Sequence, residues 1–281
     1  MYSLLYLVPK NWLSRVVGWI VRHRWPFGLH TRIRDQFIRH FHVDVSEAEH
    51  PLADYPTLGG FFIRRLRAGA RPLAAAPLVS PVDGMLTQRG LFETGESNPG
   101  LMQIKGIRYS LQSLLAEGWE ASAYAGGAFL TIYLAPWNYH RIHSPARGRV
   151  VRARHIAGAL WPVNGWSVNN IADLFVRNDR VFVEMEGEEG RFIVAMIGAT
   201  NVGRTTLSFC SELVGNSCSG SGIRDWSPLG ELALAKGAEL GCFEMGSTVV
   251  LILDSKWAAR LKPGLQGSES LPMRVGTELS A

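Results

Sequence analysis

AFLTIYLAP, residues 128–136, is an apolar run of β-branched and aromatic side chains that ends at a proline, a pattern typical of a β-strand. Similar runs, bounded by Gly, Pro or Asn, occur on both sides of it: LVSPVDGML (78–86), RVVRARHI (149–156), RVFVEME (180–186), RFIVAMIGAT (191–200) and STVVLILD (247–254). Thirty glycines and fourteen prolines provide turns between them. From about residue 78 onward, the sequence therefore predicts a mostly antiparallel β body.

The overall composition excludes several classes of protein. The chain has 281 residues, of which 47% are hydrophobic and 19% charged, so it is neither a disordered polar chain nor a polytopic membrane protein. Its length suits one large domain or two small ones. Three cysteines, Cys210, Cys218 and Cys242, are too sparse and too odd a set for a disulfide framework, and no CxxC pair is present for a zinc ribbon. This cysteine usage indicates a reducing compartment.

Positive charge is concentrated at the N-terminus. The whole chain has a formal net charge of +5, and residues 1–42 hold seven Lys or Arg against the single acid Asp35, a local charge of +6. Such a stretch suits nucleic acid or anionic lipid. Trp12, Trp19 and nearby aliphatic residues recur at helical spacing beside Arg15 and Arg22, which favours a helix lying in the membrane interface. The alternative is a helix that packs on the protein's own core.

The N-terminal region does not predict a membrane-spanning helix, because basic residues interrupt every apolar run before it reaches about 20 residues. A second helix is predicted for residues 31–41, with an apolar stripe of Ile33, Phe37, Ile38 and Phe41. An acidic connector (44–54) and the segment TLGGFFIRRLRAGARP (57–72) lead to the β body, in which YSLQSLLAEG (109–118) predicts a short helix. The fold class expected is α+β, with a basic amphipathic helical region over 1–66 and a β-rich domain over 67–281.

Two histidines stand where catalytic groups often collect, in a loop after an apolar strand. His140 and His143 lie in PWNYHRIHSP, whereas five of the eight histidines occur at or before His50. A His-x-x-His pair can bind a metal, act as an acid or base, or cap a turn. Because no clear third ligand lies at a suitable spacing, we predict no metal site.

A carboxylate and a hydroxyl complete the candidate residues. Asp83 lies in SPVDGML, where an Asp-Gly pair alone most often marks a turn, but a carboxylate can also orient an imidazole that activates a hydroxyl. Ser247 follows Gly246 and precedes an apolar strand. Glycine permits strained backbone angles, so the Ser247 hydroxyl can attack the preceding carbonyl. Taken alone, Gly-Ser-Thr usually only opens a strand.

Several motifs, in order along the chain, together resemble those of bacterial phosphatidylserine decarboxylase proenzymes. KGAELGCFEMGST (236–248) resembles the family's KGxExGxFxxGST processing site, YHRIHSP (139–145) its YHRxHxP loop, and PVDG (81–84) its Asp-Gly segment. FFIRRLRAGARP, IKGIRYSLQSLL, LWPVN, LFVRNDRV and IGATNVG extend the resemblance over nearly the whole chain. Two departures are minor: Met245 stands where bacterial members often have Leu, and LWPVN stands where an aromatic-Ser-Val-Asn is common.

The resemblance implies that the chain cuts itself between Gly246 and Ser247 into a β chain (1–246) and an α chain (247–281) that stay associated. Ser247 then becomes an amino-terminal pyruvoyl group, the covalent cofactor, which condenses with the amine of phosphatidylserine and accepts the electron pair left by CO2. The product is phosphatidylethanolamine. The resemblance also implies an Asp83–His143–Ser247 relay for cleavage and leaves His140 to assist decarboxylation or protonation.

The expected partners follow from this resemblance and from the basic N-terminus. We expect a peripheral protein on the cytoplasmic face of the cell membrane, which meets phosphatidylserine and an anionic membrane surface and binds no nucleic acid. The family also suggests homo-oligomers. Two other hypotheses stay open: a metal-dependent hydrolase built on His140 and His143, which requires bound metal, and an inactive β-barrel module that docks to membranes, which requires an uncleaved chain.

Overall fold

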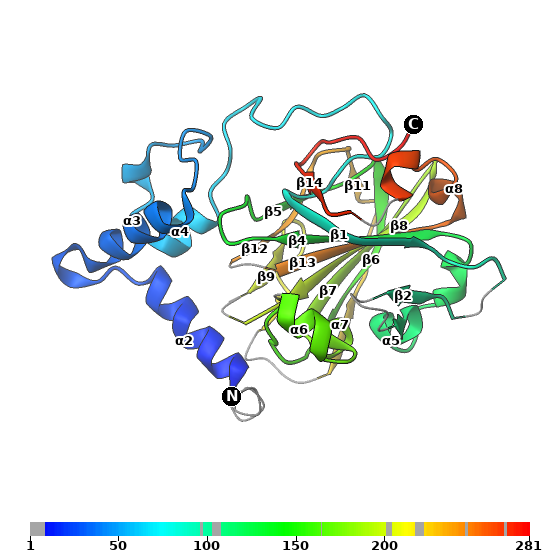
Figure 1. Cartoon of the computed structure of the whole chain (residues 1–281), viewed down its shortest axis with the longest axis horizontal. Helices are drawn as coiled ribbons and strands as arrows, with labels where there is room; N and C mark the ends of the chain where they lie inside the picture. Colours follow the sequence, from blue (N-terminus) through cyan, green and yellow to red (C-terminus); the bar gives the residue numbers. More distant parts are fainter. Residues whose placement is uncertain are drawn as a thin grey trace.

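The computed structural model describes residues 9–95, 98–102, 108–163, 165–200, 204–216, 222–244, 247–266 and 269–281 (Figure 1). A helical region comes first in the chain. Its elements are α2 (Lys10–Arg22), η1 (Pro26–Gly28), α3 (Leu29–Phe41), η2 (Leu52–Asp54) and α4 (Leu58–Phe62).

A large antiparallel sheet forms the body of the protein. Its order is β10 (Ile223–Trp226), β6 (Gly148–Ile156), β7 (Arg180–Gly187), β8 (Gly190–Gly198), β13 (Ser247–Leu253), β4 (Ala128–Leu134), β1 (Gly84–Leu91) and β14 (Leu271–Met273), with β11 (Ala233–Leu234) also paired to β6. Every ladder in this sheet is antiparallel. The predicted α+β class with an antiparallel body is confirmed.

The central strands are apolar at consecutive positions because both faces of the sheet are covered. On β13, Val249 and Leu251 belong to the core on one face, whereas Val250 and Ile252 belong to the core on the other. All four side chains are fully buried. A strand covered on one face alone would alternate apolar and polar residues instead.

Different elements cover the two faces (Figure 1). A second sheet, β5 (Arg141–His143), β12 (Glu239–Phe243) and β9 (Thr205–Leu207), packs on one face with α8 (Ser255–Ala258). The other face is covered by β2 (Gly100–Met102), β3 (Arg108–Ser110), α5 (Leu111–Leu115), η4 (Ala121–Tyr124), α6 (Gly165–Asn170) and α7 (Leu174–Arg177). A further turn, η5 (Pro263–Gln266), follows α8.

One predicted strand begins later than the sequence suggested. In LVSPVDGML, the strand β1 starts only at Gly84, and residues 81–83 form bends. Pro81 has no N–H to donate to a ladder, which prevents a regular strand there. Asp83 therefore lies just before the strand, at its entry into the sheet.

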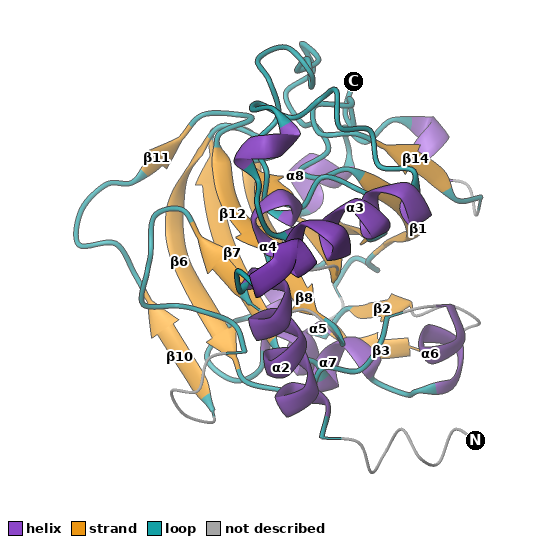
Figure 2. Cartoon of the chain, turned by 90° about the vertical axis from the view of Figure 1, so that its left-hand side faces the viewer, coloured by secondary structure: helices purple, strands orange, loops and turns teal. Residues whose placement is uncertain are grey.

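The helical region packs across one end of the two sheets (Figure 2). The predicted second helix is confirmed as α3, whose Phe37, Ile38 and Phe41 pack around buried Val43 and Phe61. The division into 1–66 and 67–281 stays a prediction.

The first helix, α2, packs one face against the rest of the protein. Lys10, Ser14, Gly18 and Val21 of α2 are buried. Trp12 and Trp19 are 61% and 54% exposed. Among the residues described, no helix is both long and apolar enough to cross a membrane.

Candidate active site

The strand register brings three separate segments together at one end of the strands of the large sheet. Tyr133 of β4 faces Met85 of β1 on one side and Thr248 of β13 on the other. Because β4 runs antiparallel to both strands, its C-terminal end lies beside their N-terminal ends. Asp83 and Ser247 therefore lie at the same end of the sheet's strands, on either side of β4, the strand that leads to His140 and His143.

His143 ends β5 and is held at both ring nitrogens. Nδ1 lies 2.8 Å from the carbonyl oxygen of Gly237, which only accepts, so Nδ1 carries the proton. Nε2 is then the acceptor, and it receives the hydroxyl of Tyr139 at 3.0 Å. Burial lowers the pKa of His143, against the opposing effects of its bond to Gly237 and the charges of Glu239 and Asp83. The ring is therefore a neutral base whose Nε2 lone pair is already engaged.

His140 is more deeply buried than His143, and its Nε2 has no hydrogen-bond partner among the described residues. Its Nδ1 donates to the carbonyl of Asn138 at 2.8 Å, so Nε2 again carries the lone pair. That Nε2 has no hydrogen-bond partner among the described residues, and the residue is only 1% exposed. The ring of Phe62 lies against it, with centroids 4.1 Å apart. Burial lowers the pKa of His140 to about 3, and the nearby charge of Arg64 acts in the same direction.

Asp83 is buried and paired with an arginine. Arg71 donates Nε to both carboxylate oxygens at 2.9 and 3.0 Å, and Nη2 to Oδ2 at 2.6 Å. The backbone N–H of Val275 donates to Oδ1 at 2.9 Å. Arg71 also forms two hydrogen bonds with Glu47. In the described part of the chain no hydrogen bond joins Asp83 to His143, so the Gly237 carbonyl orients that ring, while the Asp83 charge acts on it through space.

Ser247 begins β13 in the middle of the large sheet. Its backbone pairs with Leu134 of β4 and Gly198 of β8. Gly246 and Met245 lie outside the described residues. Only residues 244–246 separate β12, in the small sheet, from β13 in the large one. The N–H of Phe243, at the end of β12, donates to the carbonyl of His140 at 3.0 Å. The predicted cleavage segment therefore begins next to His140.

Comparison with protein families now identifies the chain. The family model described as phosphatidylserine decarboxylase matches residues 58–279, which include all four candidate residues. The chain belongs to the phosphatidylserine decarboxylase family. A second model, described as PSD, matches residues 3–42, the basic helical segment.

Relatives named phosphatidylserine decarboxylase proenzyme align over almost the whole chain. The protein from Anaeromyxobacter sp. (strain K) is 40% identical over 279 residues, which cover 99% of this chain and 96% of the relative. That from Methylibium petroleiphilum is 39% identical, with 99% and 95% covered. That from Coxiella burnetii is 36% identical, with 99% and 98% covered. The resemblance seen in the motifs is confirmed over the full length.

The structure adds residues to the family motifs that the sequence did not single out as functional. Phe62, Arg64 and Arg71 all lie in FFIRRLRAGARP, a supporting motif with no predicted role, and Tyr139 and Gly237 lie inside the two main motifs. Their types gave no signal, because arginine and phenylalanine are common in connecting segments. Their importance comes from contacts outside their own motif, such as Arg71 with Asp83, 12 positions further on, and Phe62 with His140.

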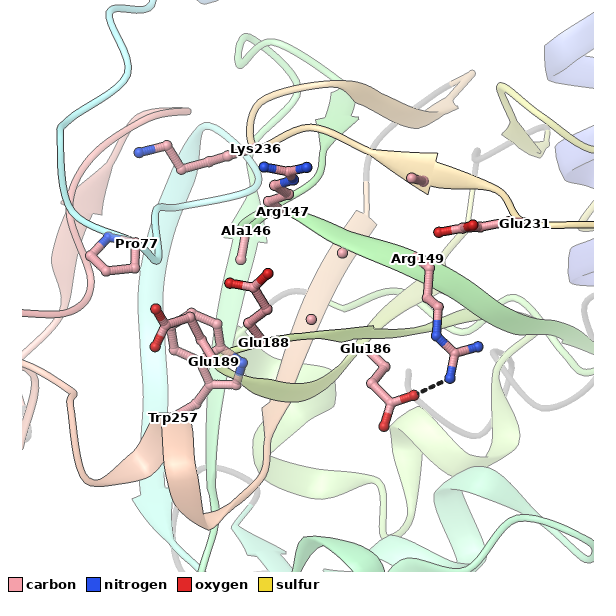
Figure 3. Close-up of a pocket in the computed structure, with 13 residues that line it drawn as sticks. Pro77, Ala146, Arg147, Arg149, Glu186, Glu188, Glu189, Glu231, Lys236 and Trp257 are labelled. Carbon is pink, nitrogen blue, oxygen red and sulfur yellow. Dashed lines mark hydrogen bonds and ion pairs between the residues drawn. The ribbon is translucent and has the colours of Figure 1, made fainter.

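The structure has a cavity away from this site and, in the described residues, no cluster of metal ligands. Within the described ranges, no group of three or more His, Cys, Asp or Glu side chains is arranged to hold a metal ion. A cavity of about 580 Å³ lies instead near Trp257, Glu188 and Lys236 (Figure 3). It adjoins Gly148 at the start of β6 and Gly187 at the end of β7. These residues lie at the opposite end of the sheet's strands from Ser247.

Proposed function

We propose that the chain is the precursor of a pyruvoyl-dependent enzyme that decarboxylates phosphatidylserine to phosphatidylethanolamine and CO2, as its family name indicates. The observation that carries the proposal is the strand register, by which Asp83, the two histidines and the start of β13 lie at the same end of the sheet's strands. Two neutral imidazoles supply bases there: Nε2 of His140 has no partner among the described residues, and Nε2 of His143 accepts the Tyr139 hydroxyl.

Self-cleavage requires a base for the Ser247 hydroxyl. Nε2 of His143 takes the Oγ proton as Oγ attacks the carbonyl of Gly246, and the amide becomes an ester once the Ser247 nitrogen receives that proton. The Tyr139 hydroxyl, which donates to the same Nε2, must turn away or relay the proton. The negative charge of Asp83 stabilises the imidazolium. β-Elimination then releases the Gly246 carboxylate, and water replaces the nitrogen of the dehydroalanine, releasing ammonia.

The surroundings of Ser247 fit the prosthetic group that this cleavage generates. Buried polar atoms of His140 and Arg64 have no partner in the described residues, so the site has hydrogen-bonding capacity in reserve for a carbonyl and a substrate. β13 lies between β4 and β8, which keeps the small fragment in place after cleavage. When formed, the pyruvoyl group supplies a carbonyl that condenses with the substrate amine and accepts the electron pair released as CO2 leaves.

His140 is suited to move one proton during decarboxylation. Burial keeps the ring neutral at pH 7 in the free protein, and the negative charge of a bound headgroup raises the pKa of His140, so that Nε2 can then accept a proton from the substrate ammonium. The same Nε2 then returns that proton to the substrate carbon that has lost CO2. Phe62 covers the ring and keeps bulk water from protonating it first.

Membrane association supports access to a lipid substrate. The exposed faces of Trp12 and Trp19 on α2, and of Phe27 just after it, point away from the buried face of the helix. Arg15 and Arg24 add positive charge for anionic lipid. We propose that this region seats the protein at the cytoplasmic face of the cell membrane. Self-association remains an expectation from the family resemblance.

An intact-mass spectrum of the freshly expressed protein tests the proposal. We expect two fragments, 1–246 and 247–281, with the smaller one lighter by one NH3 than a serine-terminated peptide. Ser247→Ala should give one uncleaved chain, and Ser255→Ala, which removes an exposed hydroxyl from the same fragment, should be cleaved like the wild type. A single wild-type chain with no reactive carbonyl and no release of CO2 from phosphatidylserine vesicles would overturn the proposal.

A further inference from the structure

Arg64 is a buried arginine with almost no hydrogen bonds. Its side chain belongs to a residue that is only 6% exposed. Nε has no partner among the described residues, and the one hydrogen bond of the guanidinium runs from Nη1 to the carbonyl of Phe61 at a long 3.4 Å. Guanidinium groups carry five N–H donors, and a buried charge without partners is costly. The unused donors require an explanation.

Neighbouring contacts hold Arg64 beside the site. The guanidinium carbon lies 4.6 Å from the centre of the Phe61 ring. On the N-terminal side, Arg141 donates to the carbonyl of Ile63 at 2.9 Å, and Phe62 lies against His140. The chain just before Arg64 is therefore held against the segment that carries the two histidines.

The charges around Arg64 leave it available for an anion. Among the charges that favour the cationic form of Arg64, that of Asp83 has the largest effect, but its carboxylate is already bound by Arg71 and Val275. No carboxylate forms an ion pair with Arg64 in the described part of the chain, whereas the adjacent Arg65 is exposed and lies 3.6 Å from Glu239. Burial lowers the pKa of Arg64, the effect expected of a cation that lacks a close partner.

From this geometry we infer that Arg64 binds an oxyanion of the substrate headgroup, its phosphate or its carboxylate, next to His140. The inference rests on the proposed function and names the residue that selects an anionic amine substrate. The planar fork of the guanidinium matches two oxygens of either group. The phosphate is the better fit to catalysis, because a strong hold on the carboxylate would stabilise the ground state that decarboxylation must leave.

Reductive capture of small amines tests this inference without measuring turnover. Self-cleaved protein is incubated with borohydride and one of four amines, and the mass of the small fragment reports how much amine is attached. Ethanolamine carries no anion, phosphoethanolamine a phosphate, serine a carboxylate and phosphoserine both. The proteins compared are wild type, Arg64→Gln, Arg64→Lys and the matched control Arg65→Gln.

In the wild type we expect half-maximal capture of phosphoethanolamine and phosphoserine at concentrations at least about 10-fold lower than for ethanolamine. Arg64→Gln should remove this advantage, so that the anionic amines and ethanolamine reach half-maximal capture at similar concentrations in that variant. Arg64→Lys should retain part of it, since lysine keeps the charge but not the fork, and Arg65→Gln should match the wild type.

The four amines separate the possible outcomes. If Arg64→Gln loses the advantage with phosphoethanolamine, Arg64 binds the phosphate. If it loses the advantage only with serine, Arg64 binds the carboxylate. Equal capture curves for wild type and Arg64→Gln with all four amines would overturn the inference while leaving the proposed function intact. If Arg64→Gln fails to cleave itself, Arg64→Lys decides by the same comparison. A wild type that captures no amine at all contradicts the proposed function, and the inference falls with it.

Discussion

The ring of Phe62 lies against the imidazole of His140, with centroids 4.1 Å apart and planes inclined by 40°. Phe62 belongs to the short helix α4, which contacts α2. The two helices are so close that a Cβ added at Gly59 of α4 would lie only 2.7 Å from Cγ of Arg22 in α2. The helical region therefore forms a wall of the candidate site as well as carrying the exposed tryptophans. This arrangement links the surface proposed to face the membrane to the residue proposed for decarboxylation.

Removing the Phe62 ring should raise the pKa of His140. In Phe62→Ala, water reaches the imidazole and stabilises its charged form, so the pKa should move from about 3 toward the usual ~6.5. Histidine NMR on uncleaved Ser247→Ala protein measures this titration. Phe27→Ala, which removes an almost fully exposed ring, is the control and should change nothing. An unchanged His140 titration in Phe62→Ala would show that the ring does not keep the site dry.

The low pKa of His140 also predicts acid sensitivity of the fold. Between pH 6.5 and about 3 the unfolded histidine binds a proton that the folded one does not, so the free energy of unfolding falls as pH falls through this range. The contribution reaches about 1.4 kcal/mol per pH unit for one proton. Urea unfolding of Ser247→Ala at pH 7 and pH 5 measures this loss. Adding His140→Phe should make it smaller, and an equal loss in both proteins would contradict the prediction.

The two histidines should separate cleavage from decarboxylation. His143→Ala removes the base proposed for Ser247, so uncleaved precursor should accumulate, as it should in Asp83→Ala. His140→Ala should still cleave, at least in part, but release CO2 from phosphatidylserine about 100-fold more slowly, the usual scale for a lost acid or base. Gel analysis and CO2 release measure the two steps. If His140→Ala blocks cleavage and His143→Ala permits it, the two roles must be exchanged.

Arg71 should stabilise the fold through its pairing with Asp83. Arg71→Gln leaves the Asp83 carboxylate buried with the Val275 N–H as its remaining hydrogen bond, which should lower the free energy of unfolding by about 3 kcal/mol. Adding Asp83→Asn should recover much of this loss, because a neutral amide needs no cation. Arg274→Gln is the control, since Arg274 is largely exposed and lies 3.6 Å from Glu47. Urea midpoints of all four proteins, each carrying Ser247→Ala so that none is cleaved, measure the effect, and a loss equal to the control would contradict the pairing.

The exposed tryptophans of α2 should contribute to membrane binding more than to folding. Trp12→Ser combined with Trp19→Ser removes apolar area from the exposed face and should weaken co-sedimentation with anionic vesicles about 10-fold or more, while self-cleavage continues. Added salt should weaken wild-type binding only in part, since apolar insertion is not screened. Leu229→Ser, at another fully exposed apolar position, is the control. Unchanged binding of the double variant would rule out this face.

Local patterns in the sequence were enough for the class of fold and the main candidates. STVVLILD and RFIVAMIGAT are apolar at consecutive positions, and they form the central strands β13 and β8, covered on both faces. The order of the motifs indicated the family, which the comparisons confirm. The roles of Asp83, His140, His143 and Ser247 remain predictions.

Only the tertiary structure decided which groups meet. Asp83 is bound by Arg71 rather than by His143, the Gly237 carbonyl orients His143, and Arg64 is buried without an anion. Strand register and the path of the linking segments determine these contacts, and both depend on pairings between distant parts of the chain, such as Thr248 with Tyr133 and Glu239 with His143. A local pattern of residue types records the propensity and burial of each segment, but not the partner that the folded chain places beside it.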